Sequence, residues 1–333
     1  MVKGEKKITN DGDYTAKDLP IPLCDPHFHM WDCIAHPNPN LGEAGQILPV
    51  YSAKNYQADM KQLPLPLYWV SGIHVETIVG QSEESEIPDI IEETSWVCSQ
   101  LNSTAQLHPF AVVAFLNLTQ ETPLSDNLLE KHIHASGNRL CGVRMILNHH
   151  PHNQDLTWPH VDSSILKNPN FRRNIALLED RNLSFDLSCN PHQIPDAVKV
   201  LRDFPDLHVI INHLGFLHDG EDETHLRLWR EGMESLATLP NTFVKLSMPW
   251  FARNGFQCNR TMGGEVGQII RDLIALFGCN RCMFASNYPV DKMQGITIPA
   301  LYRRFLEWSS DLSETDRTDL FHNTAIKAYG PIQ

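Results

Sequence analysis

The stretch IPLCDPHFHMWD, residues 21–32, holds the features that decide the fold. Its apolar start, Ile21–Cys24, has the character of a buried strand, and it stops at a group of polar residues that includes His27 and His29. Seven further short runs follow, apolar and rich in β-branched residues, as expected of strands. They are residues 73–75, 110–115, 142–147, 183–187, 208–211, 242–246 and 281–285. We therefore predict eight strands, the first of which ends in two histidines.

Stretches with helical character separate the apolar runs. They are residues 88–101, 125–134, 171–180, 195–204, 225–236 and 264–277. Strand–helix alternation is typical of a parallel sheet built from βα units, and near-continuous apolar strands indicate burial on both faces. Eight such units close into a barrel, whereas an open doubly wound sheet usually has about five to seven strands. The sequence thus predicts an α/β fold, a single (β/α)8 TIM barrel.

The length of 333 residues is compatible with one barrel, although roughly 150 residues per domain would suggest two domains. No composition shift or Gly/Ser linker marks a boundary. We expect a polar N-terminal extension at residues 1–20 and a barrel over residues 21–333. The barrel should have long βα loops, including residues 36–51 and 148–168, and a closing helix at residues 313–329. Ser313 and Asp316 resemble a capping box at the start of this helix.

Composition and charge exclude several kinds of partner. The chain is 42% hydrophobic and 20% charged, with a formal net charge of −13, which is typical of a globular protein. An acidic surface argues against nucleic acid or an anionic membrane as the main partner. It does not argue against a small anionic molecule held by one or two arginines. We therefore expect a small-molecule substrate and allow for a homo-oligomer.

The sequence also favours a cytoplasmic location. The first twenty residues lack the apolar core of a secretion signal, and no apolar run approaches the ~18 residues that span a bilayer. The eight scattered cysteines are then expected to be reduced thiols. Cys279 and Cys282 form a lone C-x-x-C, which lacks the second pair that a zinc knuckle needs.

In a TIM barrel the active site lies at the carboxyl ends of the strands, so polar residues there are candidates for function. His27 and His29 are spaced i, i+2, which places both rings on one face of a strand. Two converging imidazoles suit one divalent metal ion or two hydrogen-bond donors to one oxyanion. The alternative is a hydrogen-bonded structural pair in a polar pocket.

His74 and Glu76 repeat this spacing at the end of the second strand. A charged residue inside an apolar strand needs a partner, because an unpaired buried charge is costly. The two side chains are therefore either a buried structural pair or part of the site, as a metal ligand, a supporting group or an acid or base.

Two more strand ends, those of the fourth and sixth strands, carry candidate residues. Arg144 is suited to hold a substrate carboxylate through two parallel hydrogen bonds, or else ties loops together. His149 and His150 are adjacent and should point in opposite directions, so at most one faces the site. His213, which precedes Gly215, is placed to be a third metal ligand or an electrophile.

The order and spacing of these motifs resemble the amidohydrolase superfamily. Within it the chain looks like the amidohydrolase-2 branch, TIM-barrel hydrolases that include sugar-lactone hydrolases and 2-pyrone-4,6-dicarboxylate lactonase, with aromatic-acid decarboxylases as cousins. The resemblance covers nearly the whole chain. Its motifs are DPHFH at 25–29, GVR at 142–144, FDL at 185–187, NHLG at 212–215, KLS at 245–247 and FASNYP at 284–289.

The resemblance implies roles for particular residues. His27 and His29 match the family's strand-1 pair and His213 its strand-6 histidine, which implies a divalent metal, zinc or manganese, held by these three. Some family members work without metal, so metal-independent catalysis stays open. Asn287 stands where most members have an aspartate that binds metal or acts as base. Asparagine cannot take a proton, so the base is left open between Asp291, Glu76, a histidine and the substrate itself.

The predicted function is hydrolysis of the lactone of a small, carboxylated or hydroxylated substrate by activated water. The expected catalytic residues are His213, Asn287, Asp291 and Glu76. The expected substrate-binding residues are Arg144, His150, Trp31, Tyr288 and His74. One alternative is a metal-dependent decarboxylase or another C–O or C–N hydrolase of the same superfamily. A second is a non-catalytic binding barrel, which Asn287 favours and the retained histidines oppose.

Overall fold

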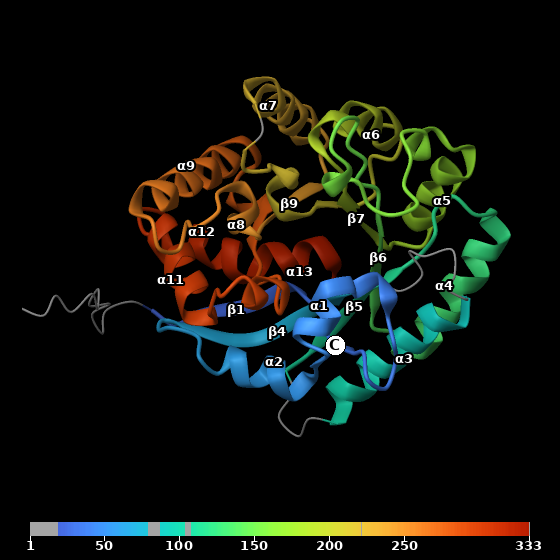
Figure 1. The fold of residues 1–333 in the computed structure, drawn as a ribbon, viewed down its shortest axis with the longest axis horizontal. Helices are drawn as coiled ribbons and strands as arrows, with labels where there is room; N and C mark the ends of the chain where they lie inside the picture. The colour runs from blue at the N-terminus through green and yellow to red at the C-terminus, as the bar shows by residue number, and fades with distance from the viewer. Residues whose placement is uncertain (1–18, 79–86, 104–107, 221, 333) are drawn as a thin grey trace, which may run out of the picture.

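Eight parallel strands form the barrel of this protein, as predicted (Figure 1). The computed structural model describes residues 19–78, 87–103, 108–220 and 222–332. The predicted N-terminal extension, residues 1–20, lies almost wholly outside them. Neighbouring strands follow chain order around the ring. They are β1 (Ile21–Phe28), β4 (Leu67–Val75), β5 (Phe110–Phe115), β6 (Leu140–Ile146), β7 (Ser184–Ser188), β8 (Val209–Ile211), β9 (Thr242–Leu246) and β10 (Cys282–Phe284).

The ring closes just beyond β10, where the chain runs beside the end of β1. The backbone N–H of Asn287 donates to the carbonyl of His27 at 2.8 Å, and that of His29 donates to the carbonyl of Tyr288 at 2.7 Å. The buried carboxylate of Asp25 adds a second tie, because it accepts hydrogen bonds from the Ser286 N–H and hydroxyl. These ties place the two strand-1 histidines next to Asn287.

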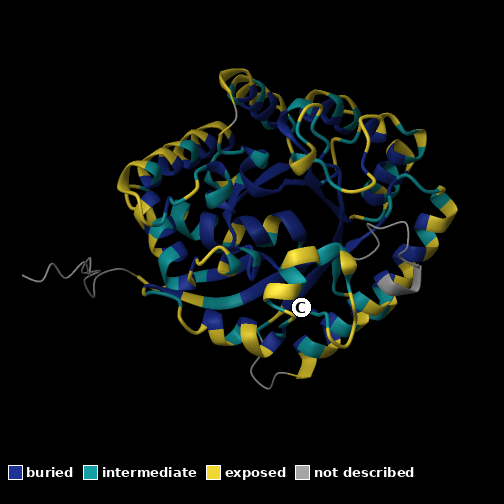
Figure 2. Cartoon of the chain, in the orientation of Figure 1, coloured by how far each residue is buried: buried dark blue, intermediate teal, exposed yellow. Residues whose placement is uncertain are grey.

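Helices surround the strands and bury their outer faces (Figure 2). Every predicted helix is present, with α6 ending three residues earlier than expected. The long ones are α3 (Ile87–Ser103), α4 (Thr122–Ser136), α5 (Pro169–Asp180), α6 (Ile194–Leu201), α7 (Glu223–Ala237), α9 (Arg260–Phe277) and α11 (Ile298–Trp308). Side-chain oxygens of Asn168, Asp222, Asn259 and Thr297 accept backbone hydrogen bonds at the starts of α5, α7, α9 and α11. No described helix is long and apolar enough to cross a membrane.

The C-terminal segment closes the amino-terminal end of the barrel. It consists of α12 (Glu314–Thr318), a π-helical turn (Asp319–Asn323) and α13 (Thr324–Tyr329). Ser313 caps α12 by accepting from the Asp316 N–H at 3.1 Å, and its hydroxyl also donates to the Asp316 carboxylate. The predicted cap is thus present, with the Asp316 side chain bonded to the Ser313 hydroxyl. From α13 the Tyr329 hydroxyl reaches into the barrel, where it donates to Asp186 at 2.7 Å.

The long loop predicted at residues 36–51 belongs to a folded insertion between β1 and β4. The segment from the end of β1 to β4 forms a two-stranded sheet, β2 (Trp31–Asp32) with β3 (Val50–Tyr51), and two helices, α1 (Gly42–Ile47) and α2 (Ala53–Met60). Helix α1 contacts α10 (Val290–Met293), which follows the eighth strand. The insertion and the segment after β10 therefore meet beside the mouth of the barrel.

Candidate active site

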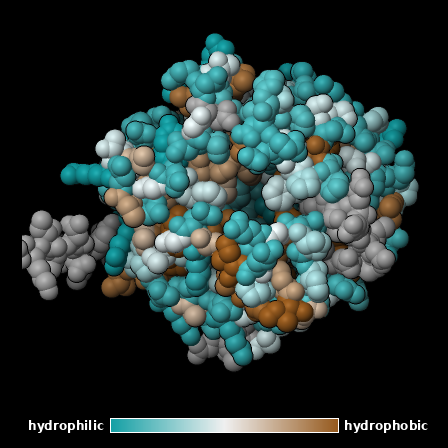
Figure 3. All heavy atoms as spheres, viewed as in Figure 1, coloured by the Kyte–Doolittle hydropathy of each residue, from teal (hydrophilic) through white to brown (hydrophobic). Residues whose placement is uncertain are grey.

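A cavity of about 340 Å³ opens at the carboxyl ends of the strands. The molecular face in Figure 3 is hollowed near its middle, and hydrophobic residues gather beside the hollow. The apolar lining side chains include Trp31, Leu41, Ile78, Ile146, Leu156, Trp158, Phe216, Met248, Trp250, Phe251, Val290 and Met293. The polar ones include His29, Glu76, Arg144, His213 and Asn287. This is the position where a TIM barrel carries its chemistry.

Strained backbone marks the same cavity. Five of its lining residues other than glycine adopt positive φ angles: Ile78 (62°), His213 (49°), Phe216 (55°), Met248 (54°) and Asn287 (54°). Such angles are costly for residues with a Cβ, most of all for a β-branched one, and they cluster at functional sites. The fold therefore holds these side chains in place at a cost in conformational energy.

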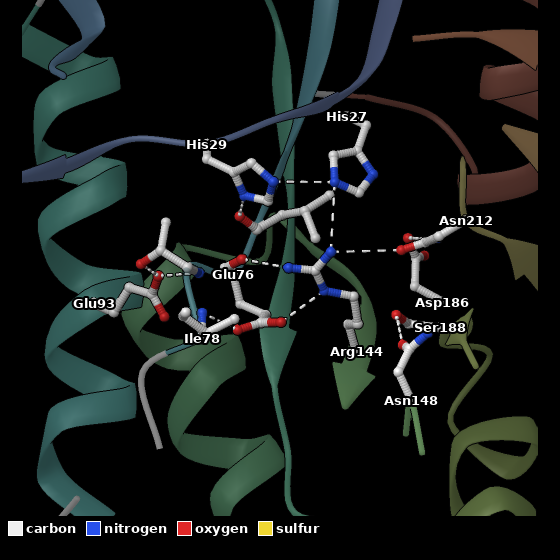
Figure 4. A network of polar contacts seen from close by, with 12 residues as sticks. His27, His29, Glu76, Ile78, Glu93, Arg144, Asn148, Asp186, Ser188 and Asn212 are labelled. Carbon is white, nitrogen blue, oxygen red and sulfur yellow. Dashed lines mark hydrogen bonds and ion pairs between the residues drawn. The ribbon is translucent and has the colours of Figure 1, made fainter. Parts of the chain in front are cut away.

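His27 and His29 converge as predicted, with their Nε2 atoms 3.1 Å apart (Figure 4). Their other partners assign the protons. His29 Nδ1 donates to the Val75 carbonyl at 2.8 Å, so its Nε2 is an acceptor. His27 Nδ1 lies 3.0 Å from the Lys245 ammonium, a donor, so the proton of His27 is on Nε2 and points to His29. Burial lowers the pKa of both rings well below the usual value, with Lys245 adding to the effect at His27 and Arg144 at His29, so both are neutral.

A buried ion pair lies beneath His27. Lys245 contacts Asp186 at 2.6 Å, and neither side chain is exposed to solvent. Asp186 also accepts from Asn212 at 3.0 Å and from the Tyr329 hydroxyl. A continuous polar chain therefore runs from the closing helix α13 through the barrel to the histidine pair. A polar chain whose members are all hydrogen-bonded holds each of them in one orientation.

Arg144 and Glu76 form a second buried ion pair at the floor of the cavity (Figure 4). Arg144 Nε donates to Glu76 Oε1 at 2.6 Å, and Nη2 donates to the Glu76 carbonyl at 2.8 Å. Arg144 Nη1 has only longer contacts, 3.5 Å to Asn212 Oδ1 and 3.5 Å to His27 Nε2. One side of the guanidinium is thus hydrogen-bonded to Glu76, while Nη1 on the other side can still donate a short hydrogen bond.

Glu76 is the buried carboxylate of the cavity lining. Burial raises its pKa, while Arg144 acts in the opposite direction. Behind it, Glu93 accepts hydrogen bonds from the N–H and hydroxyl of Thr77, and burial together with the Glu76 charge raises the pKa of Glu93 to about 8. Two carboxyl groups thus share one poorly solvated region, which favours a proton on one of them near neutral pH.

His213 lies beside the histidine pair. Its ring centroid is 4.5 Å from that of His27, and its Nδ1 lies 2.9 Å from the Ser247 hydroxyl. Burial, and then the positive charge of Arg144, lower the pKa of His213 well below the usual value. His213 therefore lines the cavity as a neutral ring with a fixed orientation.

Asn287 lies in the cavity wall, and Asp291 lies one helical turn behind it. Asn287 Nδ2 donates to Asp291 Oδ1 at 2.8 Å, and Trp250 Nε1 donates to the same oxygen at 3.0 Å. Burial raises the pKa of Asp291 to about 7. These bonds fix the Asn287 amide and the Trp250 ring, and they place Asp291 outside the cavity lining.

The structure brings together most of the predicted site. His29, Glu76, Arg144, His213, Asn287 and Trp31 line the cavity, and His27 and Asp291 contact lining residues from behind. Sequence reasoning assigned no role to Lys245, Asp186 or Asn212, although a lysine inside an apolar strand was a usable signal. It also missed Trp158, Phe216 and Phe251, which come from loops whose paths the sequence does not reveal.

Three predicted substrate-binding residues lie outside the cavity lining. His74 is buried and accepts the Met30 N–H at Nε2, so it supports the backbone next to His29, and it is not bonded to Glu76. Tyr288 donates its hydroxyl to the Ile296 carbonyl and packs away from the cavity. His150 accepts two loop N–H groups, and its ring lies edge-to-face with that of His192. None of the three is among the residues that line the cavity.

The residues present do not fit a metal site as they stand. Within the described ranges, no group of three or more His, Cys, Asp or Glu side chains is placed to hold a metal ion. A ligating His27 Nε2 would have to lose its proton to Nδ1, which faces the Lys245 ammonium. The metal role expected of His27, His29 and His213 therefore conflicts with this arrangement.

A closed ring of eight parallel strands, with a cavity at its carboxyl ends whose floor is polar, defines a TIM-barrel enzyme. The amidohydrolase family model matches residues 24–330, and the chain belongs to this family of hydrolases. An uncharacterized protein, y4mH, of Sinorhizobium fredii is 29% identical over 93% of this chain and 98% of its own.

Solved structures share the fold at lower identity. An amidohydrolase from Burkholderia multivorans, crystallised with zinc, has a TM-score of 0.73 at 22% identity over 92% of this chain and 98% of its own. A Pseudomonas putida protein provisionally described as a 2-pyrone-4,6-dicarboxylic acid hydrolase has a TM-score of 0.64 at 17% identity, over 94% of this chain and 98% of its own. A 2,6-dihydroxybenzoate decarboxylase from Rhizobium has a TM-score of 0.56 at 13% identity, over 94% of this chain and 99% of its own.

Proposed function

We propose that this hydrolase opens a small lactone by attack of water on the ester carbonyl. The observation that carries the proposal is the pairing, on one cavity floor, of a spare Arg144 donor with the buried carboxylate of Glu76. Ester hydrolysis needs these two parts, a donor for the developing oxyanion and a base for the attacking water.

Glu76 is proposed as the base because it is the buried carboxylate that faces the cavity. It takes a proton from water as the water oxygen bonds to the carbonyl carbon, and the carbonyl oxygen gains negative charge against Arg144 Nη1. When the ring C–O bond breaks, the proton passes to the leaving oxygen, and the product is a hydroxy acid. Asp291 is the less favoured base, because Asn287 separates it from the cavity and cannot relay a proton as a base would.

His213 adds to the donor side of the site. It lines the cavity as a neutral ring, whereas the Nε2 proton of His27 is already directed to His29. A neutral ring donates without adding another charge to a buried cluster that already holds Lys245 and Arg144. Each donor that an oxyanion hole loses typically lowers kcat by about 100- to 1000-fold.

The test is a panel of lactones assayed for ring opening, with protein that carries a measured metal content. We expect proton release and a hydroxy acid product, with turnover that survives chelation. Release of carbon dioxide from an aromatic acid would instead identify a decarboxylase, and binding without turnover would identify a binding protein. Stoichiometric zinc whose removal abolishes turnover would overturn the metal-free form of the proposal.

A further inference from the structure

The walls of the cavity differ from its polar floor in being mostly apolar. Above the polar floor the lining is dominated by aromatic and aliphatic side chains. Five of the lining residues are aromatic: Trp31, Trp158, Phe216, Trp250 and Phe251. They come from the insertion after β1, the loop after β6, and the segments after β8 and β9. Four separate loops therefore contribute aromatic side chains to one enclosure.

The asparagine and serine side chains of the walls are already hydrogen-bonded, either to one another or to backbone carbonyls. Asn148 Nδ2 donates to Asn190 Oδ1 at 2.9 Å, and the Ser188 hydroxyl donates to Asn148 Oδ1 at 2.8 Å. Asn190 Nδ2 in turn donates to the Leu156 carbonyl at 2.7 Å, and Asn40 Nδ2 donates to the Ile78 carbonyl at 3.0 Å. Of the described buried polar side-chain atoms of the lining, only Trp158 Nε1 has no hydrogen-bond partner. A substrate hydroxyl elsewhere in the walls would lose its water partners and meet groups that are already satisfied, which is unfavourable.

The charges of the cavity also disfavour an anionic substrate. Among the described lining residues, Arg144 is the only lysine or arginine, and it is paired with Glu76. Asp155 adds an exposed negative charge to the lining. An additional substrate carboxylate would therefore find no uncommitted cation in these walls. The second face of Arg144 is needed for the ester carbonyl itself.

We infer that the substrate is a lactone with an apolar, preferably aromatic, body and no charged group. The inference rests on the lactone hydrolysis proposed above, and it replaces the carboxylated or hydroxylated substrate expected from the sequence. The cavity volume of about 340 Å³ suits a compact molecule of one or two rings. Aromatic walls bind such a body by burying its apolar surface and by ring contacts.

Three probes test the inference on the full chain: dihydrocoumarin, D-galactono-1,4-lactone and 2-pyrone-4,6-dicarboxylate. Ring opening is followed as proton release after subtraction of the enzyme-free rate. We expect kcat/KM for dihydrocoumarin to exceed that of each polar lactone by about 100-fold or more, because an apolar site discriminates against added hydroxyl groups by about this factor. Equal or better turnover of a polar lactone would overturn this inference and leave lactone hydrolysis standing. No turnover of any probe would reject lactone hydrolysis, and this inference with it.

A positive charge placed in the cavity wall should change the preference between apolar and anionic lactones. Leu41→Arg places a cation at a half-buried position of the lining, so we expect kcat/KM to rise for the pyrone dicarboxylate and to fall for dihydrocoumarin. Leu124→Arg, on the exposed side of α4, adds the same charge away from the cavity and is the matched control. Quenching of tryptophan fluorescence by dihydrocoumarin provides a binding readout independent of turnover, because three tryptophans line the cavity. An unchanged preference in a folded Leu41→Arg protein would contradict the role assigned to the walls.

Discussion

At the scale of single residues, Lys245 determines how the histidine pair can act. Its ammonium faces His27 Nδ1 and is held by Asp186, so the His27 proton lies on Nε2 toward the site. The residue touches neither the cavity nor a substrate, and we regard it as a positioning residue. It also accounts for the conflict with metal binding, since a metal at His27 Nε2 would need the opposite tautomer.

Lys245→Met should therefore release the His27 tautomer. We expect kcat to fall by about 10- to 100-fold, and imidazole ¹⁵N shifts to change from the Nε2-protonated form to a mixture of tautomers. Stability should also fall by about 3–5 kcal/mol, because Asp186 is left as an unpaired buried charge. The double variant Lys245→Met, Asp186→Asn should recover stability without recovering kcat. Full activity in either folded variant, with an unchanged ¹⁵N spectrum, would show that Lys245 does not orient His27.

Asp291 predicts a pH dependence of stability. Its folded pKa of about 7 lies above the usual aspartate value of 3.8, so the folded state binds the proton more tightly. The resulting stabilisation is fully present below about pH 4 and is lost as pH rises through about 7. Asp291→Asn removes this dependence, while its Oδ1 can still accept from Asn287 and Trp250. In thermal melts, the Tm of the variant minus the Tm of the wild type should thus increase by several degrees between pH 5 and pH 8.5. A difference in Tm that stays constant with pH would contradict the raised pKa.

At the scale of elements, the close contact of β6 and β7 limits what their sequences can be. Gly142 is buried opposite Ser184, and a Cβ at this position would lie 2.0 Å from the Ser184 hydroxyl and 2.8 Å from the Ser184 carbonyl. The carbonyl belongs to the backbone and cannot rotate away. The two strands carry Arg144 and Asp186, so their spacing also sets the distance between the two ion pairs.

Gly142→Ala should therefore destabilise the barrel by about 1–3 kcal/mol, the usual cost of overpacking. We expect a lower midpoint in urea with little change in its slope. Gly264→Ala is the matched control, since a Cβ there meets nothing within 4 Å. Equal urea midpoints for the two variants would contradict this prediction, because the two strands could then move apart without a loss of stability.

At the scale of the whole molecule, the barrel could be predicted from the sequence because each strand is a short apolar run set between helical stretches. It also placed His29, Glu76, Arg144, His213 and Asn287 at strand ends, and the parallel barrel brings these ends together. His74, Tyr288 and His150 point elsewhere because local backbone groups, not the cavity, take their hydrogen bonds. The partners of Lys245 come from β1, β7 and α13, a long-range arrangement that no local pattern encodes.

In the proposed reaction Glu76, beside Arg144, activates the water that opens the lactone. This role is tested by the pH–rate profile of Glu76→Gln against that of the wild type, on the lactone that the panel identifies. Glutamine keeps the shape of the side chain but cannot accept the proton, so kcat should fall by about 100- to 10,000-fold. The acidic limb of the wild-type profile should disappear. A folded variant with kcat within a few-fold of the wild type and the same acidic limb would contradict this role for Glu76 and would point to Asp291 as the base.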